Sequence, residues 1–342
     1  MGKRHTGLKI LFLFILMALI GGTAFLPYYL SLAPASDNDE EVLFQVKQGE
    51  SLHLIADHLK SYNLIKSEKM LIIYSRIRKT SVSFRAGTYS LKRGMNLKQI
   101  HDSLVFGEEI RLNIVIPEGW TMRQIAERLE EKQLADADIF LEKARDPELL
   151  AEFGIPADSF EGYLYPDSYS FPMNYPVEEI LKSMARNFFD HISKIYPDYR
   201  DMTEKQFHDK IIVASIVEKE YKRVDEAPII ASVFFNRLRI NIHLQSCATV
   251  NYIITDIQGR PHTDTLYKSD LEIDSPYNTY KYLGLPKGPV ANPGPVALNA
   301  AFYPANTNYY FFVLEDPSTG KHTFTTYLDE HIEAKYRNKK NY

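Results

Sequence analysis

The chain has 342 residues, of which 45% are apolar, and a formal net charge of −4. This mixture is that of an ordinary soluble protein, and the length is sufficient for about two domains. A slightly negative chain that lacks a basic block interleaved with aromatic residues gives no support to nucleic-acid binding. Cys247 is the single cysteine, which excludes an intrachain disulfide and any Cys/His metal spacing. We therefore expect stability to come from packing, with no metal and no cofactor.

The N-terminal segment, residues 1–36, reads as a membrane anchor. Basic side chains precede residues 10–26, which carry no charge and are long enough to cross a hydrocarbon core as one helix. Acidic residues follow, and this charge asymmetry places the N-terminus in the cytoplasm and the body outside it. A cleaved signal peptide is the alternative, with Gly22-Thr23-Ala24 as its nearest cleavage site. We predict a single-pass protein of the cytoplasmic (inner) membrane, whose body is periplasmic if the envelope is Gram-negative.

An internal repeat lies within residues 42–150. Residues 46–64 and 116–134 share one pattern, in which a short apolar strand ends at a glycine and apolar residues then recur at helical spacing. The positions that match are Gly49 with Gly119, Ile55 with Ile125, Ala56 with Ala126, Leu59 with Leu129, and Leu64 with Leu134. A shorter third copy begins at residue 91. The polar residues that can cap the three helices are Ser51, Asn96 and Thr121.

The first copy of the repeat resembles a LysM module. Gly49, Ser51, Leu52, Ile55 and Ala56 supply its Gly-x-[ST]-Leu-x-x-Ile-Ala pattern. The resemblance implies a small βααβ unit that binds glycans containing N-acetylglucosamine. A LysM-like scaffold that only orients the next domain fits the same residues, so glycan affinity is left open.

Residues 211–220 join an apolar run directly to two carboxylates. A stretch that is apolar on every side predicts a helix buried all round. At least one of Glu218 and Glu220 is then poorly solvated, which raises a carboxyl pKa and suits a general acid. The alternative is that the helix ends there and both acids lie in solvent, paired with Lys222 or Arg223 at helical spacing.

Other elements surround this helix in the sequence. We predict helices over residues 177–195 and 227–238, and a hairpin of strands 308–315 and 321–326. Residues 158–172 form a turn-rich aromatic segment.

Three later loops carry polar side chains among glycines and prolines. They cover residues 244–252, 275–280 and 284–294. Hydroxyl and amide groups on rigid loops match the hydroxyl and acetamido groups of sugars, although ordinary turn chemistry explains any one of them. The predicted substrate-binding residues are Gln245, Ser246, Thr249, Asn278, Thr279, Tyr280 and Asn292.

Seven ordered segments together resemble the MltG/YceG-like family of endolytic murein transglycosylases. They are EGYLYPDSYSF, ASIVEKE, ASVFFNRL, LQSCATV, SPYNTY, GLPKGPVANPG and HTFTT. The resemblance extends from about residue 8 to residue 331. Two departures occur. Cys247 stands in a Ser-Cys-Ala triplet where many relatives have Thr-Asp-Pro, and Lys287 replaces a common proline.

The resemblance implies an α+β protein: a transmembrane helix, one or more LysM-like α/β subdomains, and an α+β catalytic domain over residues 151–342. It implies non-hydrolytic cleavage of the β-1,4 bond between N-acetylmuramic acid and N-acetylglucosamine, which leaves 1,6-anhydromuramoyl ends and ends strand elongation. Glu218 corresponds to the family's acid and base. We assign supporting roles to Glu220, Glu161 and Tyr165. The implied partners are peptidoglycan strands and peptidoglycan synthases.

A second acid would point to a hydrolase instead. Glu220 lies two residues from Glu218, so a regular helix directs the two nearly opposite ways, whereas a glycosidase needs two carboxylates across one bond. Glu161, Asp167 and Asp225 could still supply a second acid. The alternatives are therefore a muramidase and a non-catalytic, membrane-tethered peptidoglycan-binding scaffold. A pyridoxal-phosphate lyase is a poorer third, since no lysine has a cofactor-like setting.

Overall fold

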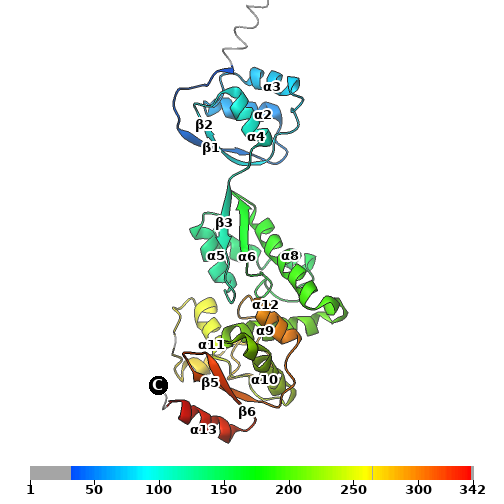
Figure 1. Cartoon of the computed structure of the whole chain (residues 1–342), viewed down its shortest axis with the longest axis vertical. Coiled ribbons are helices and arrows are strands. Elements are labelled where there is room, and N and C mark those ends of the chain that lie inside the picture. The colour runs from blue at the N-terminus through cyan, green and yellow to red at the C-terminus, as the bar shows by residue number, and fades with distance from the viewer. Residues whose placement is uncertain (1–31, 264, 340–342) are drawn as a thin grey trace, which may run out of the picture. The chain divides into compact units, whose positions relative to one another are not determined.

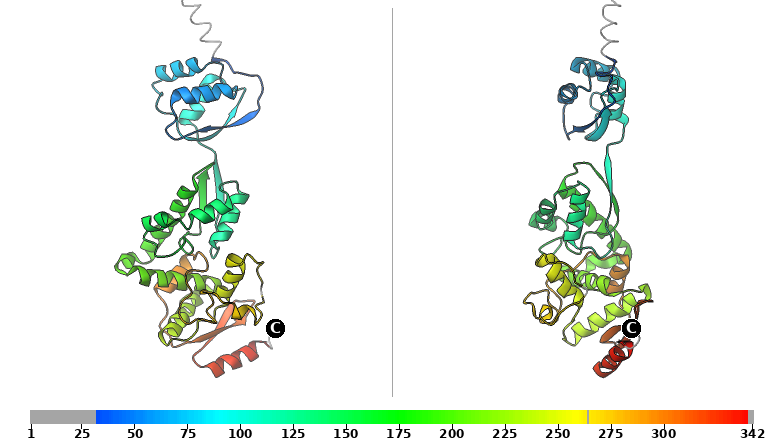
Figure 2. Two further views of the ribbon diagram at one scale, coloured as in Figure 1. Left: turned by 180° about the vertical axis from the view of Figure 1, so that it is seen from behind. Right: turned by 90° about the vertical axis from the view of Figure 1, so that its left-hand side faces the viewer.

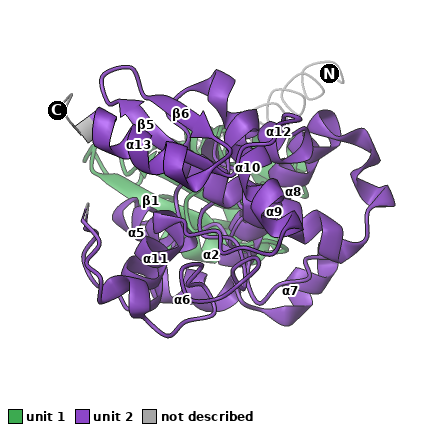
Figure 3. Cartoon of the chain, turned by 90° about the horizontal axis from the view of Figure 1, so that it is seen from below, with its two compact units in different colours: residues 1–112, 172–174 green, residues 113–171, 175–342 purple. Residues whose placement is uncertain are grey.

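A computed structural model describes residues 32–263 and 265–339 and divides the chain into two compact units (Figure 3). Unit 1 extends to Leu112 and includes Pro172–Asn174, and unit 2 holds the remainder. The predicted membrane anchor lies outside the described residues. Within those residues, no helix is long and apolar enough to cross a membrane.

Unit 1 is built on one antiparallel strand pair, in which Phe44 of β1 lies opposite Tyr89 of β2. Its elements are β1 (Glu41–Val46), α2 (Leu52–Ser61), α3 (Glu68–Ile77), β2 (Gly87–Lys92) and α4 (Leu97–Phe106). Buried residues from all five elements form its core. Strand, helix, helix, strand is the order that the LysM resemblance implies, while glycan binding by this unit stays a prediction.

The turns that the repeat predicts are present in both units. Gly49 and Gly119 have φ of +76° and +73°, a region that favours glycine because it lacks a Cβ. The side chains of Ser51, Asn96 and Thr121 each accept a hydrogen bond from a backbone N–H in the first turn of the helix that follows. The predicted caps are therefore confirmed, and the repeat reflects a shared strand–turn–helix geometry.

Unit 2 is mainly helical (Figure 1). Its helices are α5 (Met122–Glu131), α6 (Ala137–Lys143), α7 (Pro147–Glu152), α8 (Val177–Ile195), α9 (Glu204–Glu220), α10 (Ala227–Arg239), α11 (Cys247–Tyr252), α12 (Pro295–Phe302) and α13 (Leu328–Lys339). Its strands pair as β3 (Arg111–Val115) with β4 (Ser168–Pro172) and β5 (Phe311–Asp316) with β6 (Lys321–Thr325). Short 3₁₀ turns cover Pro197–Asp201, Val224–Glu226 and Asp270–Glu272, and a π-helical turn covers Ile253–Ile257. The described chain is thus α+β, as predicted.

The compact units divide the chain earlier than the predicted division at residue 150. Residues 113–150 belong to unit 2 because α5 packs on α6, and α6 packs on α8. The second copy of the repeat, residues 116–134, therefore forms part of unit 2 and not of unit 1. Sequence similarity between the copies could not show this, because each copy packs against different neighbours.

Helix α9 lies at the centre of unit 2. Every residue from Ile211 to Val217 is buried, which confirms the predicted helix with apolar residues on all sides. It packs against α12, α10 and α11. Ser215, fully buried, donates to the Ile212 carbonyl at 2.8 Å and accepts from the Val290 N–H at 3.0 Å. The helix is thereby joined to the loop that precedes α12.

The remaining predicted elements are also present. Helix α8 has the predicted bounds, and α10 ends one residue later than predicted. The hairpin is β5 with β6, and α13 packs on β5, as both views of Figure 2 show in orange and red at the C-terminal end.

Candidate active site

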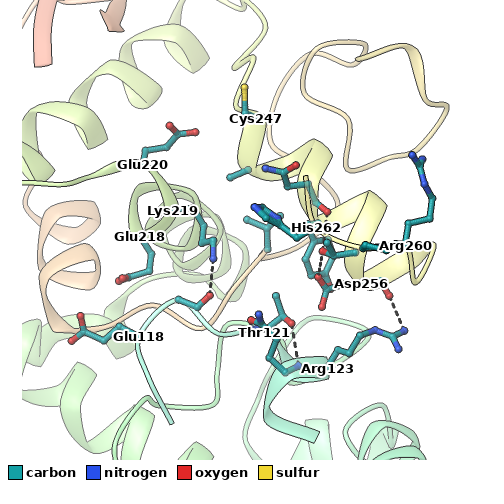
Figure 4. A pocket seen from close by; sticks show the side chains of 18 of the residues that line it. Glu118, Thr121, Arg123, Glu218, Lys219, Glu220, Cys247, Asp256, Arg260 and His262 are labelled. Atoms are coloured by element: carbon teal, nitrogen blue, oxygen red, sulfur yellow. Dashed lines mark hydrogen bonds between the residues drawn. The ribbon is translucent and has the colours of Figure 1, made fainter. Parts of the chain in front are cut away.

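A cleft of about 790 Å³ opens in unit 2 beside the C-terminal end of α9. Its walls come from that helix end, from the turn at residues 118–121, and from α11 with the segment that follows it. Figure 4 shows Glu218, Glu118 and Glu220 on one side of the cleft, and Asp256 with His262 on the other. The cleft therefore combines three segments of unit 2 that are far apart in the sequence.

Glu218 occupies the cleft as a partly buried carboxyl group. Its Oε2 accepts a hydrogen bond from the Gly294 N–H at 2.9 Å, and Gly294 is the residue that precedes α12. The Glu218 pKa is raised to about 7, chiefly by burial and to a lesser extent by the nearby Glu118 charge. The hydrogen bond from Gly294 and the charge of Lys219 lower the same pKa. Among the described residues, no protein group donates to Oε1, so this oxygen is available to exchange a proton in the cleft.

Glu118 is a second carboxylate on the same wall, and we predicted no role for it from the sequence. A Cβ placed on Gly294 would collide with the Glu118 carboxyl group, so this side chain and Glu218 contact the same glycine. The first copy of the repeat has Gln48 where the second has Glu118, so the two copies differ at this position.

The turn at Gly119 sets the position of Glu218. Lys219 donates from Nζ to the Gly119 carbonyl at 3.1 Å, and the Gly119 N–H donates to the Asn292 carbonyl at 2.9 Å. A Cβ at Gly119 would lie 3.3 Å from Cγ of Glu218, closer than most Cβ contacts, so the Glu218 side chain would have to shift slightly. Glycine at this position thus provides both the positive φ and the space for the carboxyl group.

Asn292, a predicted substrate-binding residue, joins three loops from a fully buried position. Its Oδ1 accepts from the N–H groups of Gly162 and Leu164 at 2.9 Å each. Its Nδ2 donates to the Trp120 carbonyl and to Glu161 Oε1 at 3.0 Å each. All its polar capacity is therefore used within the protein, and direct contact with substrate stays a prediction.

Glu161 lies beneath the cleft with 2% of its surface exposed. Its carboxyl group accepts from the Met122 N–H at the start of α5 and from the Tyr252 hydroxyl at 3.2 Å. Its pKa is raised to about 8, chiefly by burial and also by the Asp256 charge. These contacts tie α5 to α11, and the supporting role of Glu161 in the reaction stays a prediction.

Ser246, Thr249 and Thr279, three further predicted binding residues, form a buried hydroxyl network. The Thr279 hydroxyl accepts from the Ser246 N–H at 3.1 Å and lies 2.9 Å from the Thr249 hydroxyl. Ser246 Oγ donates to Glu220 Oε1 at 2.6 Å. The network therefore fixes Glu220, whose pKa burial raises. The substrate contacts of the three hydroxyl residues stay predictions.

The other predicted residues lie in separate places. Asn278 is fully buried, and its Nδ2 donates to two loop carbonyls at 3.0 and 2.8 Å. Gln245 and Tyr280 line a second, smaller cavity rather than the cleft. Tyr165 is buried, and its ring stacks on His191 with centroids 3.9 Å apart. The structure thus brings Glu218 and Glu220 to the cleft and places these four residues elsewhere.

The opposite wall carries residues that the sequence did not reveal. Arg123 donates from Nη2 to the Asp256 carbonyl at 3.0 Å, and Thr255 donates to Asp256 Oδ2 at 2.6 Å. Burial raises the Asp256 pKa. Arg260 and His262 also line the cleft. Asp256, Arg260 and His262 lie in a segment without a recognisable motif, so only folding shows that they line the same cleft as Glu218.

None of the three acids proposed from the sequence as a partner for Glu218 lines the cleft. Glu161 is buried beneath it, Asp167 accepts from Asn187 at 3.0 Å, and Asp225 pairs with Arg223 at 2.9 Å. Over residues 32–263 and 265–339, no group of three or more His, Cys, Asp or Glu side chains is placed to hold a metal ion.

The family model of the YceG-like family matches residues 44–337, which is most of the chain. The chain belongs to the YceG-like family. The match includes both units and every residue of the cleft, so the predicted family resemblance is confirmed.

Relatives of this YceG-like chain carry one shared name. A protein from Bacillus subtilis (strain 168) is 34% identical over 93% of this chain and 90% of its own length, and it is named endolytic murein transglycosylase. A protein of the same name from Streptococcus pneumoniae serotype 2 is 27% identical over 96% of this chain and 64% of its own length. A crystal structure of a YceG-like protein from Listeria monocytogenes matches with a TM-score of 0.58 and 32% identity, over 86% of this chain and 99% of that one.

The two glycines of the repeat allow a matched test of the site. We expect Gly119→Ala and Gly49→Ala each to lower the free energy of unfolding by about 1 kcal/mol, since both require a positive φ. Gly119→Ala alone should displace Glu218, whereas nothing lies within 4 Å of a Cβ at Gly49. The measurement is hydrogen exchange at the Gly294 amide, which should accelerate only in Gly119→Ala. Equal exchange in both variants would contradict this placement of Gly119.

Proposed function

We propose that this protein is an endolytic lytic transglycosylase that cuts peptidoglycan glycan strands without water. The main support is Glu218, a partly buried carboxyl group in the cleft whose pKa is raised to about 7. The chain that carries it belongs to the YceG-like family. A group that titrates near neutral pH can donate and then accept a proton. The names of the relatives support murein as the substrate.

The proposed reaction begins with protonated Glu218. It donates its proton to the glycosidic oxygen as the bond from C1 of N-acetylmuramic acid to that oxygen breaks, which releases N-acetylglucosamine with a free hydroxyl. The Glu218 carboxylate then takes the proton from the C6 hydroxyl of the same muramoyl residue. The C6 oxygen bonds to C1 and gives a 1,6-anhydro end. One acid is sufficient because the substrate supplies the nucleophile.

The surroundings of Glu218 suit both halves of this cycle. Burial and the Glu118 charge favour the protonated form before cleavage. The Gly294 N–H favours the carboxylate that exists between the two proton transfers. In the proposed reaction the negative charge of Glu118 would stabilise positive charge that develops at the muramoyl C1.

Location and partners belong to the same proposal. An anchor in residues 1–36 would hold the cleft near the membrane face where new strands emerge, on the extracytoplasmic side. An endolytic cut there would release the strand and set its length. Peptidoglycan synthases are then natural partners, and unit 1 would contribute glycan affinity if it is a working LysM module.

The product distinguishes this reaction from hydrolysis. We expect the full chain to release fragments with 1,6-anhydromuramoyl ends from purified peptidoglycan, as measured by mass spectrometry. Glu218→Gln should lower the rate more than a hundredfold while the fold is retained, because it removes the proposed proton donor. Glu127→Gln, which alters another acid of the cleft, is the control and should retain activity.

Other products would favour the alternatives. Reducing muramic acid ends would indicate a muramidase, for which Asp256 on the opposite wall is the available second carboxyl group. Binding to insoluble peptidoglycan with no soluble product would indicate a scaffold. Full activity in Glu218→Gln would show that another group is the acid.

The pH profile tests the role of Glu118. Because Glu218 must be protonated to act, activity falls as pH rises through its pKa. Glu118→Gln removes a charge that raises this pKa, so we expect the basic limb of kcat/KM to move to lower pH. Glu127→Gln should leave that limb in place. A limb that stays fixed or moves to higher pH in Glu118→Gln would contradict the coupling.

A further inference from the structure

A second cavity of about 430 Å³ lies next to the cleft in unit 2, and the proposed reaction does not use it. Its walls come from the end of α10, the loop that leads to α11, β5 and α13. Glu220 and Cys247 line both this cavity and the cleft. The second cavity and the cleft are therefore neighbours that share these two residues.

The cavity contains a buried arginine without a carboxylate partner. Arg237 is 8% exposed and donates to the Leu244 carbonyl at 2.9 Å and to Gln245 Oε1 at 3.4 Å. The Phe311 ring lies 5.1 Å from its guanidinium carbon. Its Nε is buried with no hydrogen-bond partner. No carboxylate of the described chain lies within ion-pair distance of Arg237, and a buried charge in this state is costly unless something compensates it.

Two residues of α13 complete the polar lining. His331 and Lys335 stand one helical turn apart and both line the cavity. His331 Nδ1 is buried without a partner. Burial, with Lys335 and Arg237 nearby, lowers the His331 pKa to about 4, so this ring is neutral and able to donate a hydrogen bond at physiological pH. Arg237, His331 and Lys335 together make a site for an anion.

The chemistry of Arg237 suits a carboxylate. One carboxylate matches one buried guanidinium and can be held by two parallel N–H groups. Glu220 also lines the cavity, and its Oε1 accepts from Ser246. Burial raises the Glu220 pKa, which favours its uncharged form beside a bound anion. Stem peptides on muramic acid carry such carboxylates, and they are attached to the sugar that the cleft would hold.

We propose that the cavity around Arg237, His331 and Lys335 binds a carboxylate of the stem peptide on the glycan strand being cut. This inference rests on the proposed function for the source of the ligand. It assigns substrate selection to a site outside the cleft: Glu218 acts on the sugar, and the Arg237 cavity recognises a charged peptide beside it.

The kinetic test compares glycan strands whose stem peptides are intact with the same strands after their peptide carboxylates are converted to amides. We expect the full chain to cut the intact strands with a KM roughly tenfold lower, the effect of a charge-assisted hydrogen bond. Arg237→Gln and Lys335→Gln should reduce this ratio with little change in kcat. Arg337→Gln, on α13 but outside the cavity lining, is the matched control and should keep the wild-type ratio.

A binding test separates the cavity from the reaction. Calorimetry on the full-length Glu218→Gln chain would use an N-acetylated stem tetrapeptide as the free acid, the same peptide with every carboxylate converted to an amide, and inorganic phosphate. We expect binding of the free acid only, and its loss in the double variant with Lys335→Glu. Equal binding of acid and amide, or equal KM for both strands, would overturn the proposal, as would phosphate binding as tightly as the peptide. Absence of any cleavage would instead count against the proposed function.

Discussion

The proposed chemistry depends on one carboxyl group, that of Glu218, which is partly removed from water at the end of a fully buried helix. Helix α9 is buried on every side up to Val217, so Glu218 emerges directly from the core into the cleft. The core fixes the backbone beneath it, and the Gly294 N–H fixes one oxygen. Only the protonation state of Glu218 can still change, and burial raises its pKa toward neutral pH. A rigid acid with one free oxygen is what a single-residue proton cycle requires.

Two loops hold this carboxyl group, and both are tied to the core by buried polar contacts. The turn at Gly119 contacts Asn292 and Lys219, and the loop before α12 contacts Ser215. Asn292 shows one reason why the motifs contain many polar residues. Its buried side-chain amide makes hydrogen bonds with four groups, and a buried amide must be satisfied within the fold. Such residues shape the cleft from behind, so a motif can belong to an active site without its side chains entering it.

Sequence patterns predicted the elements better than the surroundings of the site. The bounds of α8, the buried character of α9 and the caps at Ser51 and Thr121 follow from local periodicity and turn chemistry, which are encoded within a few residues. The division into units did not follow, because the copies of the repeat are alike locally and differ only in what they pack against. Glu118 and Asp256 come to the same cleft as Glu218 only through tertiary folding. No local sequence pattern predicts this arrangement.

The central claim is that Glu218 holds its proton up to neutral pH because of where it lies. The most direct measurement is a titration of the full chain labelled with ¹³C at glutamate side-chain carboxyls, with the Glu218 signal assigned by its loss in Glu218→Gln. We predict a pKa of about 7 for this group, raised from 4.5. A midpoint near 4.5 would contradict the claim, since Glu218 would then be ionised at neutral pH and unable to donate the first proton.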